Sequence, residues 1–164
     1  MKPKNLLLKL ILFLIFSQLV FAQSISPDKV IEIKTIVPHA ISSAGLVDVE
    51  IILNIKKEWH INSNKPLDEN LVPTVLSFKE IPGIQIQKIT YPKPSIEKLP
   101  FMESQLSLYE NEVIIRVQFK VNKKSGIKQF NLEGTVKYQP CNNQTCLFPV
   151  SKQFSIILAP NKAK

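Results

Sequence analysis

The chain has two cysteines, Cys141 and Cys146, and four residues separate them. Such a close pair can be a small structural staple, or it can be a working dithiol that exchanges disulfides with other proteins. By chain entropy, closing so short a loop stabilises a fold by only about 2 kcal/mol. A domain with a substantial core does not need that contribution, which favours a reactive role. The spacing alone leaves both the staple and the dithiol open.

Other chemistries find less support in the sequence. A structural zinc site needs four ligands, and the two histidines, His39 and His60, have no ligand-like spacing to each other or to the cysteines. A Cys-x-x-Cys motif ahead of a helix is absent, as is a methionine-rich stretch that could bind copper. We therefore expect neither a metal nor a cofactor.

The amino-terminal segment has the pattern of an export signal. Two lysines among the first four residues precede a continuous apolar run, Leu10–Phe16, and a small-x-small site ends at Ala22. This pattern predicts a signal peptide over residues 1–22, cleaved before Gln23. An uncleaved membrane anchor is the alternative, but the apolar stretch falls short of the roughly 20 residues that span a bilayer. We expect one exported, periplasmic domain over residues 23–164, in a compartment where disulfides form.

The charge of the chain does not indicate a nucleic-acid partner. The formal net charge is +8, and three lysines lie within the predicted signal peptide, so the charge of the remainder is +5. The remaining lysines are scattered, without an arginine cluster or interleaved aromatic residues. This distribution is typical of a solvated surface and argues against nucleic-acid binding.

The elements that must position the cysteines are strands. Apolar and polar residues alternate with a period of two, which is typical of half-buried strands. The clearest runs are Ile31–Val37, Val47–Ile55, Val113–Val121, Phe130–Tyr138 and Phe154–Leu158, and shorter candidates are Val75–Phe78 and Ile84–Thr90. Turn residues separate these runs. Seven to nine short strands predict an all-β, immunoglobulin-like antiparallel β-sandwich. The segment Tyr91–Met102 contains three prolines and is predicted to be a long, functional loop.

Several separate motifs resemble one family. The run Tyr138–Cys141, followed by Cys146 and Pro149, resembles the cysteine segment of the amino-terminal periplasmic domain of the thiol:disulfide interchange protein DsbD. The segment Trp59–Pro66 is similar to that domain's tryptophan-led strand and loop. Phe101 precedes a strand that we expect to start near Tyr109, as in that domain. The resemblance covers nearly all of the chain after the predicted signal peptide.

The resemblance implies an immunoglobulin-like sandwich with a redox-active cysteine pair. By this likeness Cys146 would be the exposed thiol that bonds to a partner, and Cys141 would resolve the mixed disulfide. Phe101 resembles an aromatic cap over the disulfide, although plain core packing is its alternative. Tyr138 would end a strand beside the pair. The cysteine spacing is one residue shorter than in the best-known member, which puts the geometry of the loop in doubt rather than its chemistry.

The family also implies partners. Its domains receive electrons from a membrane-embedded protein and pass them to thioredoxin-fold proteins of the periplasm. Because the sequence ends at Lys164 without a membrane domain, we expect the electron donor to be a separate membrane protein. The chain would then be a component of a protein-disulfide reductase. The alternative is a non-catalytic immunoglobulin-like binding module with a structural disulfide, and a measured reduction potential would separate the two.

Overall fold

The computed structural model describes residues 25–37, 42, 45–122 and 129–159. The predicted signal peptide and His39 lie outside these residues. The described part of the chain contains one short 3-10 helix, η1 (Pro27–Lys29), and eleven strands. None of its helices is long and apolar enough to cross a membrane.

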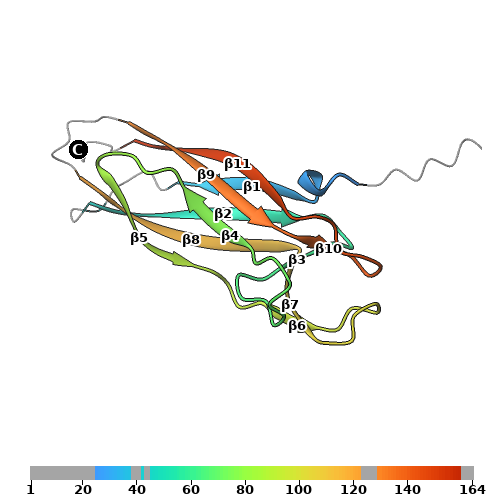
Figure 1. Ribbon diagram of the computed structural model, residues 1–164. Coiled ribbons are helices and arrows are strands. Elements are labelled where there is room, and N and C mark those ends of the chain that lie inside the picture. Colours follow the sequence, from blue (N-terminus) through green and yellow to red (C-terminus); the bar gives the residue numbers. More distant parts are fainter. Residues whose placement is uncertain (1–24, 38–41, 43–44, 123–128, 160–164) are drawn as a thin grey trace, which may run out of the picture.

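Two sheets form the layers of a sandwich (Figure 1). The first, sheet A, has the order β1 (Ile31–Ile36), β2 (Leu46–Ile55), β8 (Glu112–Val121) and β5 (Ile84–Thr90). The second, sheet C, has the order β11 (Val150–Leu158), β9 (Phe130–Tyr138) and β4 (Val75–Phe78). All neighbouring strands in these sheets are antiparallel. The fold is thus the all-β antiparallel sandwich that the alternating pattern predicted.

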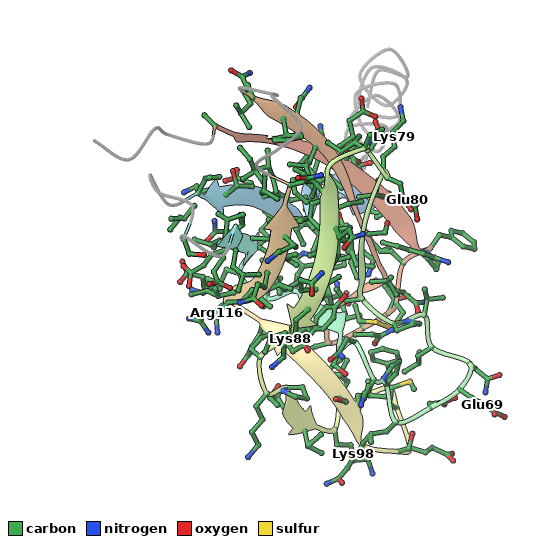
Figure 2. All side chains as sticks on the ribbon, turned by 90° about the vertical axis from the view of Figure 1, so that its left-hand side faces the viewer. Glu69, Lys79, Glu80, Lys88, Lys98 and Arg116 are labelled. Carbon is green, nitrogen blue, oxygen red and sulfur yellow. A yellow bond between two sulfur atoms is a disulfide. The ribbon has the colours of Figure 1, made fainter. Side chains whose placement is uncertain are left out.

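The main core lies between sheets A and C. In β9 alternate residues from Phe130 to Tyr138 are buried, as the sequence predicted, and the residues between them are exposed or half-buried. Phe119 of β8 meets Phe78 of β4 edge to face across the layers, with ring centroids 5.1 Å apart. Charged groups lie outside, for example Arg116, whose Nε donates a hydrogen bond of 3.0 Å to Glu50 Oε1 on the neighbouring strand (Figure 2). The main core between the layers therefore contains neither cysteine.

A third sheet, sheet B, lies at one end of the sandwich and carries the cysteine segment (Figure 1). Its order is β10 (Pro140–Cys141), β3 (His60–Asn62), β7 (Leu106–Glu110) and β6 (Ser95–Glu97). Ile61 of β3 and Tyr109 of β7 are register partners and belong to the main core. Because successive side chains alternate between the faces of a sheet, the flanking residues point to the opposite, outer face.

Sheet B is where the structure departs from the sequence prediction. Strand β6 lies inside the segment Tyr91–Met102, which was predicted to be a loop, and β7 begins at Leu106 rather than near Tyr109. The first four residues of β7 are all buried, so this strand has no alternating pattern to reveal it. The chain passes from β7 to β8 through Asn111, whose φ of 57° lies in the left-handed region that asparagine tolerates.

Candidate functional site

The two cysteines form a disulfide across a small hairpin at the end of the sandwich. Their Cα atoms are 4.0 Å apart, and they face each other in an antiparallel bridge. Leu147 N donates to Pro140 O at 2.8 Å, and Asn142 N donates to Thr145 O at 2.9 Å. These bonds close the two ends of the hairpin. The cysteines therefore pair with each other near the rim, as their spacing predicted.

An asparagine side chain shapes the tip of this hairpin. Asn142 Oδ1 accepts hydrogen bonds from the backbone N–H groups of Gln144 at 2.8 Å and Thr145 at 2.9 Å. Asparagine commonly binds the backbone two residues further along the chain and thereby sets a turn. The tip is thus fixed by its own sequence, and the bend does not depend on the disulfide alone.

Gln139 anchors the hairpin to the rest of the domain. Its Oε1 accepts hydrogen bonds of 3.1 Å from Asn62 Nδ2 and from Val72 N. Its Nε2 donates to Leu147 O at 3.3 Å, on the far side of the cysteine loop. One side chain therefore ties both ends of the hairpin to β3 and to the loop that follows β3. Gln139 lies within the Tyr138–Cys141 motif, but the sequence alone does not predict this anchoring role.

The disulfide lies under an apolar cover. Cys141 has no exposed surface and packs in a cluster with Leu99, Leu106 and Leu108, which are also buried. Leu71, Met102 and Cys146 are partly buried against the same cluster. Leu106 and Leu108 belong to the floor formed by β7, whereas Leu99 and Met102 come from the proline-rich segment. This segment therefore contributes to the cover, which gives it a structural reason to lie at the site.

The two aromatic residues assigned by resemblance occupy different environments. Phe101 lies in the covering segment but is 39 % exposed. It is not among the residues packed in the cluster around Cys141, whereas its neighbours Leu99 and Met102 are. Tyr138 ends β9, as expected, and is fully buried in the main core. Its hydroxyl group donates a hydrogen bond of 2.8 Å to Pro27 O, so the structure shows it as an anchor for the start of the domain.

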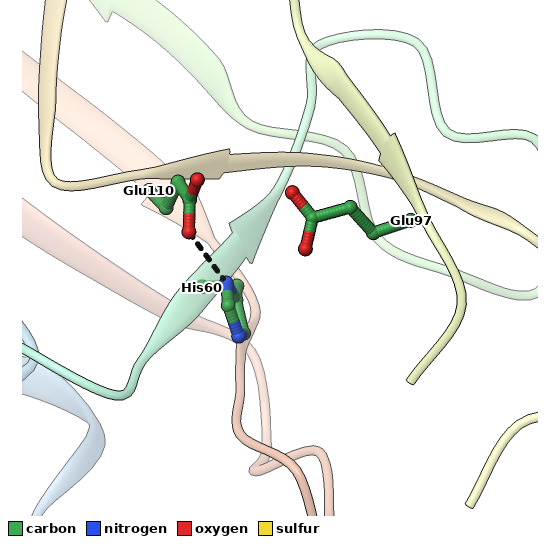
Figure 3. A group of neighbouring side chains, drawn as sticks. All are labelled: His60, Glu97 and Glu110. Carbon is green, nitrogen blue, oxygen red and sulfur yellow. Dashed lines mark ion pairs between the residues drawn. The ribbon is translucent and has the colours of Figure 1, made fainter. Parts of the chain in front are cut away.

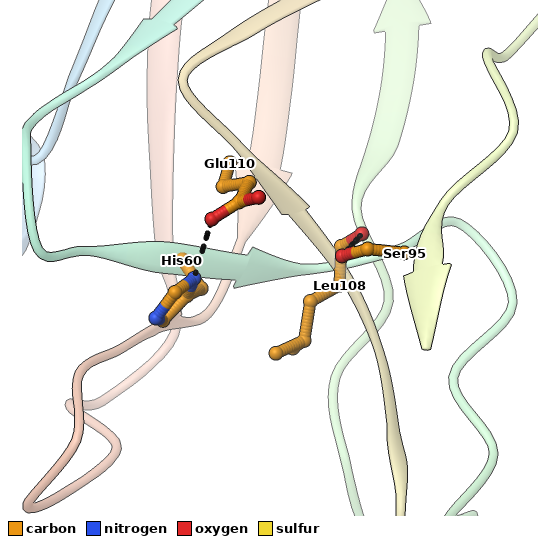
Figure 4. Close-up of polar contacts among 4 residues, drawn as sticks. All are labelled: His60, Ser95, Leu108 and Glu110. Atoms are coloured by element: carbon orange, nitrogen blue, oxygen red, sulfur yellow. Dashed lines mark hydrogen bonds and ion pairs between the residues drawn. The ribbon is translucent and has the colours of Figure 1, made fainter. Parts of the chain in front are cut away.

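A polar row crosses sheet B beside the disulfide. Cys141 of β10 is the register partner of His60 of β3, and His60 is the partner of Glu110 of β7. Directly opposite residues in an antiparallel pair project from the same face. His60 Nδ1 lies 3.6 Å from Glu110 Oε2 (Figure 4). On the neighbouring strand, Ser95 Oγ donates a hydrogen bond of 3.3 Å to Leu108 O, and this bond joins β6 to β7. The resemblance named Trp59–Pro66 as a motif, but sequence alone gave His60 no role.

Three tyrosine hydroxyl groups, those of Tyr91, Tyr109 and Tyr138, have raised pKa values. Burial, followed by the negative charge of Asp28, raises the pKa of Tyr138 to about 12. Burial also raises the pKa of Tyr109, whose hydroxyl group shares its single proton between two acceptors, Asn64 Oδ1 at 2.7 Å and Pro92 O at 3.1 Å. Both hydroxyl groups therefore stay protonated at neutral pH and act as hydrogen-bond donors. Through Tyr109, the loop after β3 and the proline-rich segment are held to β7.

This arrangement has defined chemical possibilities. A disulfide can accept two electrons from a thiol donor, and exchange starts when a thiolate reaches one of the two sulfur atoms. Cys146 is partly exposed, while Cys141 is enclosed. Fold and site together define an immunoglobulin-like all-β domain with one disulfide in a short rim hairpin. The comparison with known proteins goes one step further.

The sequence matches the family described as "Thiol:disulfide interchange protein DsbD, N-terminal" over residues 28–158. The chain belongs to this family. Among solved structures, it is similar to the N-terminal periplasmic domain of ScsB from Proteus mirabilis, with a TM-score of 0.56 and 18 % sequence identity. That alignment covers 84 % of this chain and 51 % of the other, so the chain spans about half of the ScsB chain. The likeness confirms the immunoglobulin-like fold.

A second solved structure is more distant. The full-length major pilin SpaD from Corynebacterium diphtheriae aligns with a TM-score of 0.37 and 8 % identity, over 79 % of this chain and 34 % of the pilin. No curated protein matches the sequence.

Proposed function

We propose that this domain is a thiol–disulfide exchange module that passes electrons through Cys141 and Cys146 to thioredoxin-fold proteins. The observation that carries the proposal is the asymmetry of the disulfide in a member of the DsbD N-terminal family. Cys146 is partly exposed on a rim hairpin, and Cys141 is buried beneath the cover. Exchange needs one sulfur atom that a partner can reach and a second that stays close enough to complete the reaction.

Exchange would transfer two electrons in two thiolate attacks. In the reduced domain the Cys146 thiolate attacks one sulfur atom of the partner's disulfide, which forms a mixed disulfide and releases the partner's first thiolate. The Cys141 thiolate then attacks Cys146 Sγ, which restores the internal disulfide and releases the partner's second thiolate. Two electrons pass to the partner, whose disulfide becomes a dithiol. A dithiol of an electron donor would reduce the domain again.

Exposed apolar residues around the hairpin support a docking role. Phe148, two residues after Cys146, is 88 % exposed, and Phe101 of the covering segment is 39 % exposed. An exposed aromatic side chain beside a reactive sulfur atom suits a contact with the apolar rim of a partner's active site. We expect Phe148→Ala to slow exchange with a thioredoxin-fold partner while leaving reduction by dithiothreitol unchanged.

Trapping of the mixed disulfide tests the proposal. Cys141→Ala leaves Cys146 without its resolving thiol, so a purified thioredoxin-fold disulfide isomerase should form a stable covalent adduct that appears on a non-reducing gel. Cys146→Ala should form little adduct, and the double variant none. Adducts that form only through Cys141 would contradict the assignment of roles.

The reduction potential separates exchange from a structural staple. An exchange module should equilibrate with periplasmic shuttles, whereas structural disulfides resist reduction with potentials below about −300 mV. A potential in that lower range, together with no trapped adduct, would favour the non-catalytic binding module.

We also propose that the protein is exported to the periplasm. The signal pattern in residues 1–22 supports export to the periplasm, and the ScsB domain to which the chain is similar is periplasmic. Mass spectrometry of the native protein should find an amino terminus at Gln23. A membrane-bound protein that keeps Met1 would contradict this.

A further inference from the structure

A second cluster of reactive side chains lies on the same face of sheet B as Cys141, next to the disulfide. His60, Glu97 and Glu110 come from three different strands, β3, β6 and β7. One ligand atom of each residue lies within 4.8 Å of the ligand atoms of the other two. Figure 3 shows both carboxylate groups directed towards the imidazole ring. These are an imidazole nitrogen and two carboxylate oxygens, which are common ligands of divalent metal ions.

An unsatisfied nitrogen atom gives independent support for a ligand at this position. His60 is 9 % exposed, and its Nδ1 atom is buried without a hydrogen-bond partner. The nearest carboxylate oxygen, Glu110 Oε2, is 3.6 Å away, which exceeds the length of a normal hydrogen bond. A buried polar atom without a partner is unfavourable. A metal ion between Nδ1 and the carboxylate groups would satisfy it.

The separation of one pair of ligand atoms already fits a small divalent ion, and the Glu97 carboxylate, within 4.8 Å of both, would move closer to complete the set. Zinc binds histidine nitrogen and carboxylate oxygen at about 2.0–2.2 Å, so two of its tetrahedral ligands lie about 3.3–3.6 Å apart. The observed separation of 3.6 Å between His60 Nδ1 and Glu110 Oε2 falls at the end of this range. The side chain of Glu110 is 42 % exposed, so water can reach a fourth position. We propose that His60, Glu97 and Glu110 form a three-ligand site for a divalent metal ion of the Zn²⁺ class.

A metal ion at this site would connect separate parts of the sheet. Glu97 ends β6, two residues before Leu99, which is buried against Cys141. Glu110 ends β7, and His60 is the register partner of Cys141. The ion would therefore join the segment that leads into the cover to the two strands beneath it. Metal binding does not depend on the proposed exchange reaction, and each can be tested without the other.

Titration calorimetry with ZnCl₂ tests the site in tag-free protein whose disulfide is intact, because an oxidised protein offers no free thiol to zinc. We expect saturable binding of one ion. Glu97→Gln and Glu110→Gln each remove one charged ligand at a residue that is not fully buried, and each should weaken binding at least about tenfold, since even outer-shell changes cost 10–100-fold. A ¹⁵N-HSQC titration should shift the amide signals of β3, β6 and β7.

Two matched controls distinguish this site from general zinc adsorption. His39→Gln removes the other histidine of the chain, and Glu103→Gln makes the same charge change on an exposed residue near the cover. Both variants should bind zinc as tightly as the unmodified protein. The proposal is overturned if no saturable binding occurs, if Glu97→Gln and Glu110→Gln bind zinc with unchanged affinity, or if the shifted signals lie outside sheet B.

Discussion

Cys141 and Cys146 share one disulfide, yet Cys141 is buried and Cys146 is partly exposed. Cys141 is fully buried among leucine side chains, whereas Cys146 is partly exposed on the outer arm of the hairpin. Their Cα atoms are only 4.0 Å apart, so this difference in residue exposure arises within a single hairpin turn. The two cysteines therefore differ in their exposure to solvent, although they are close together in sequence and in space.

This difference predicts unequal alkylation of the reduced protein. After reduction, Cys146 should react with iodoacetamide faster than Cys141, because a reagent must reach a thiolate before it can modify it. Peptide mass spectrometry at short reaction times would measure the two rates, and thermal unfolding should confirm that the reduced protein stays folded. Equal rates for the two cysteines in the folded protein would remove the basis for assigning Cys146 as the attacking thiol.

We expect the covering segment, Tyr91–Met102, to slow the reduction of the disulfide by small thiols. Met102→Ala and Phe101→Ala should both speed reduction by dithiothreitol, and Met102→Ala should have the larger effect because Met102 packs in the cluster with Cys141. Because Phe101 is 39 % exposed, its removal should cost less than the 3–5 kcal/mol or so that a core phenylalanine contributes. Stopped-flow reduction and urea unfolding would give the two quantities.

Phe148→Ala is the control for this effect, since Phe148 is 88 % exposed and should not affect reduction by a small thiol. If Phe101→Ala leaves the reduction rate unchanged and lowers stability strongly, Phe101 is part of the packing and does not act as a cap.

The hydrogen bonds of Gln139 hold the hairpin to the rest of the domain, so we expect their loss to lower the stability of the domain. Gln139→Leu keeps the volume of the side chain but leaves Asn62 Nδ2 and Val72 N without their shared acceptor. Leaving buried or half-buried donors unsatisfied should lower the free energy of unfolding by about 1–3 kcal/mol. Urea unfolding would measure this loss. Gln139→Glu keeps an acceptor oxygen and should lose less, whereas equal losses would argue against the hydrogen-bond network.

The layers of the sandwich could be predicted from the sequence, while much of sheet B could not. The long strands β2, β8 and β9 bury one face, so the alternation of apolar and polar residues in the sequence predicts them. Strand β7 is buried on both faces over most of its length, and β3, β6 and β10 have only two or three residues each. Strands this short or this buried carry no period that a sequence can reveal.

The candidate site was predictable only in part for a similar reason. The cysteine pair stands out because its spacing is visible in the sequence. His60, Glu97 and Glu110 come together only when β3, β6 and β7 align, and 49 residues separate the first from the last. The roles of Leu99 and Met102 likewise depend on how the proline-rich segment folds back over Cys141. Long-range pairing, which a local pattern does not encode, created these contacts.

The raised pKa of Tyr138 predicts that the domain becomes less stable at alkaline pH. Burial and the charge of Asp28 raise this pKa to about 12 in the folded domain, above the ordinary value of 10.0. A raised pKa means that the folded state holds the proton more tightly than the unfolded state does. The contribution of Tyr138 to the free energy of unfolding is fully present below about pH 10 and is lost as the pH rises through about 12. The pKa values of Tyr91 and Tyr109 are raised as well, so all three tyrosines should add to the loss.

Tyr138→Phe separates the contribution of this residue. At neutral pH the variant should lose about 1 kcal/mol, because the hydrogen bond to Pro27 O disappears. Between about pH 10 and 12 its free energy of unfolding should fall less steeply than that of the unmodified protein, since one group that releases a proton on unfolding is gone. Urea unfolding at several pH values, with the disulfide verified by mass spectrometry, would measure both effects. An identical alkaline slope in the two proteins would show that the Tyr138 hydroxyl group does not govern this dependence.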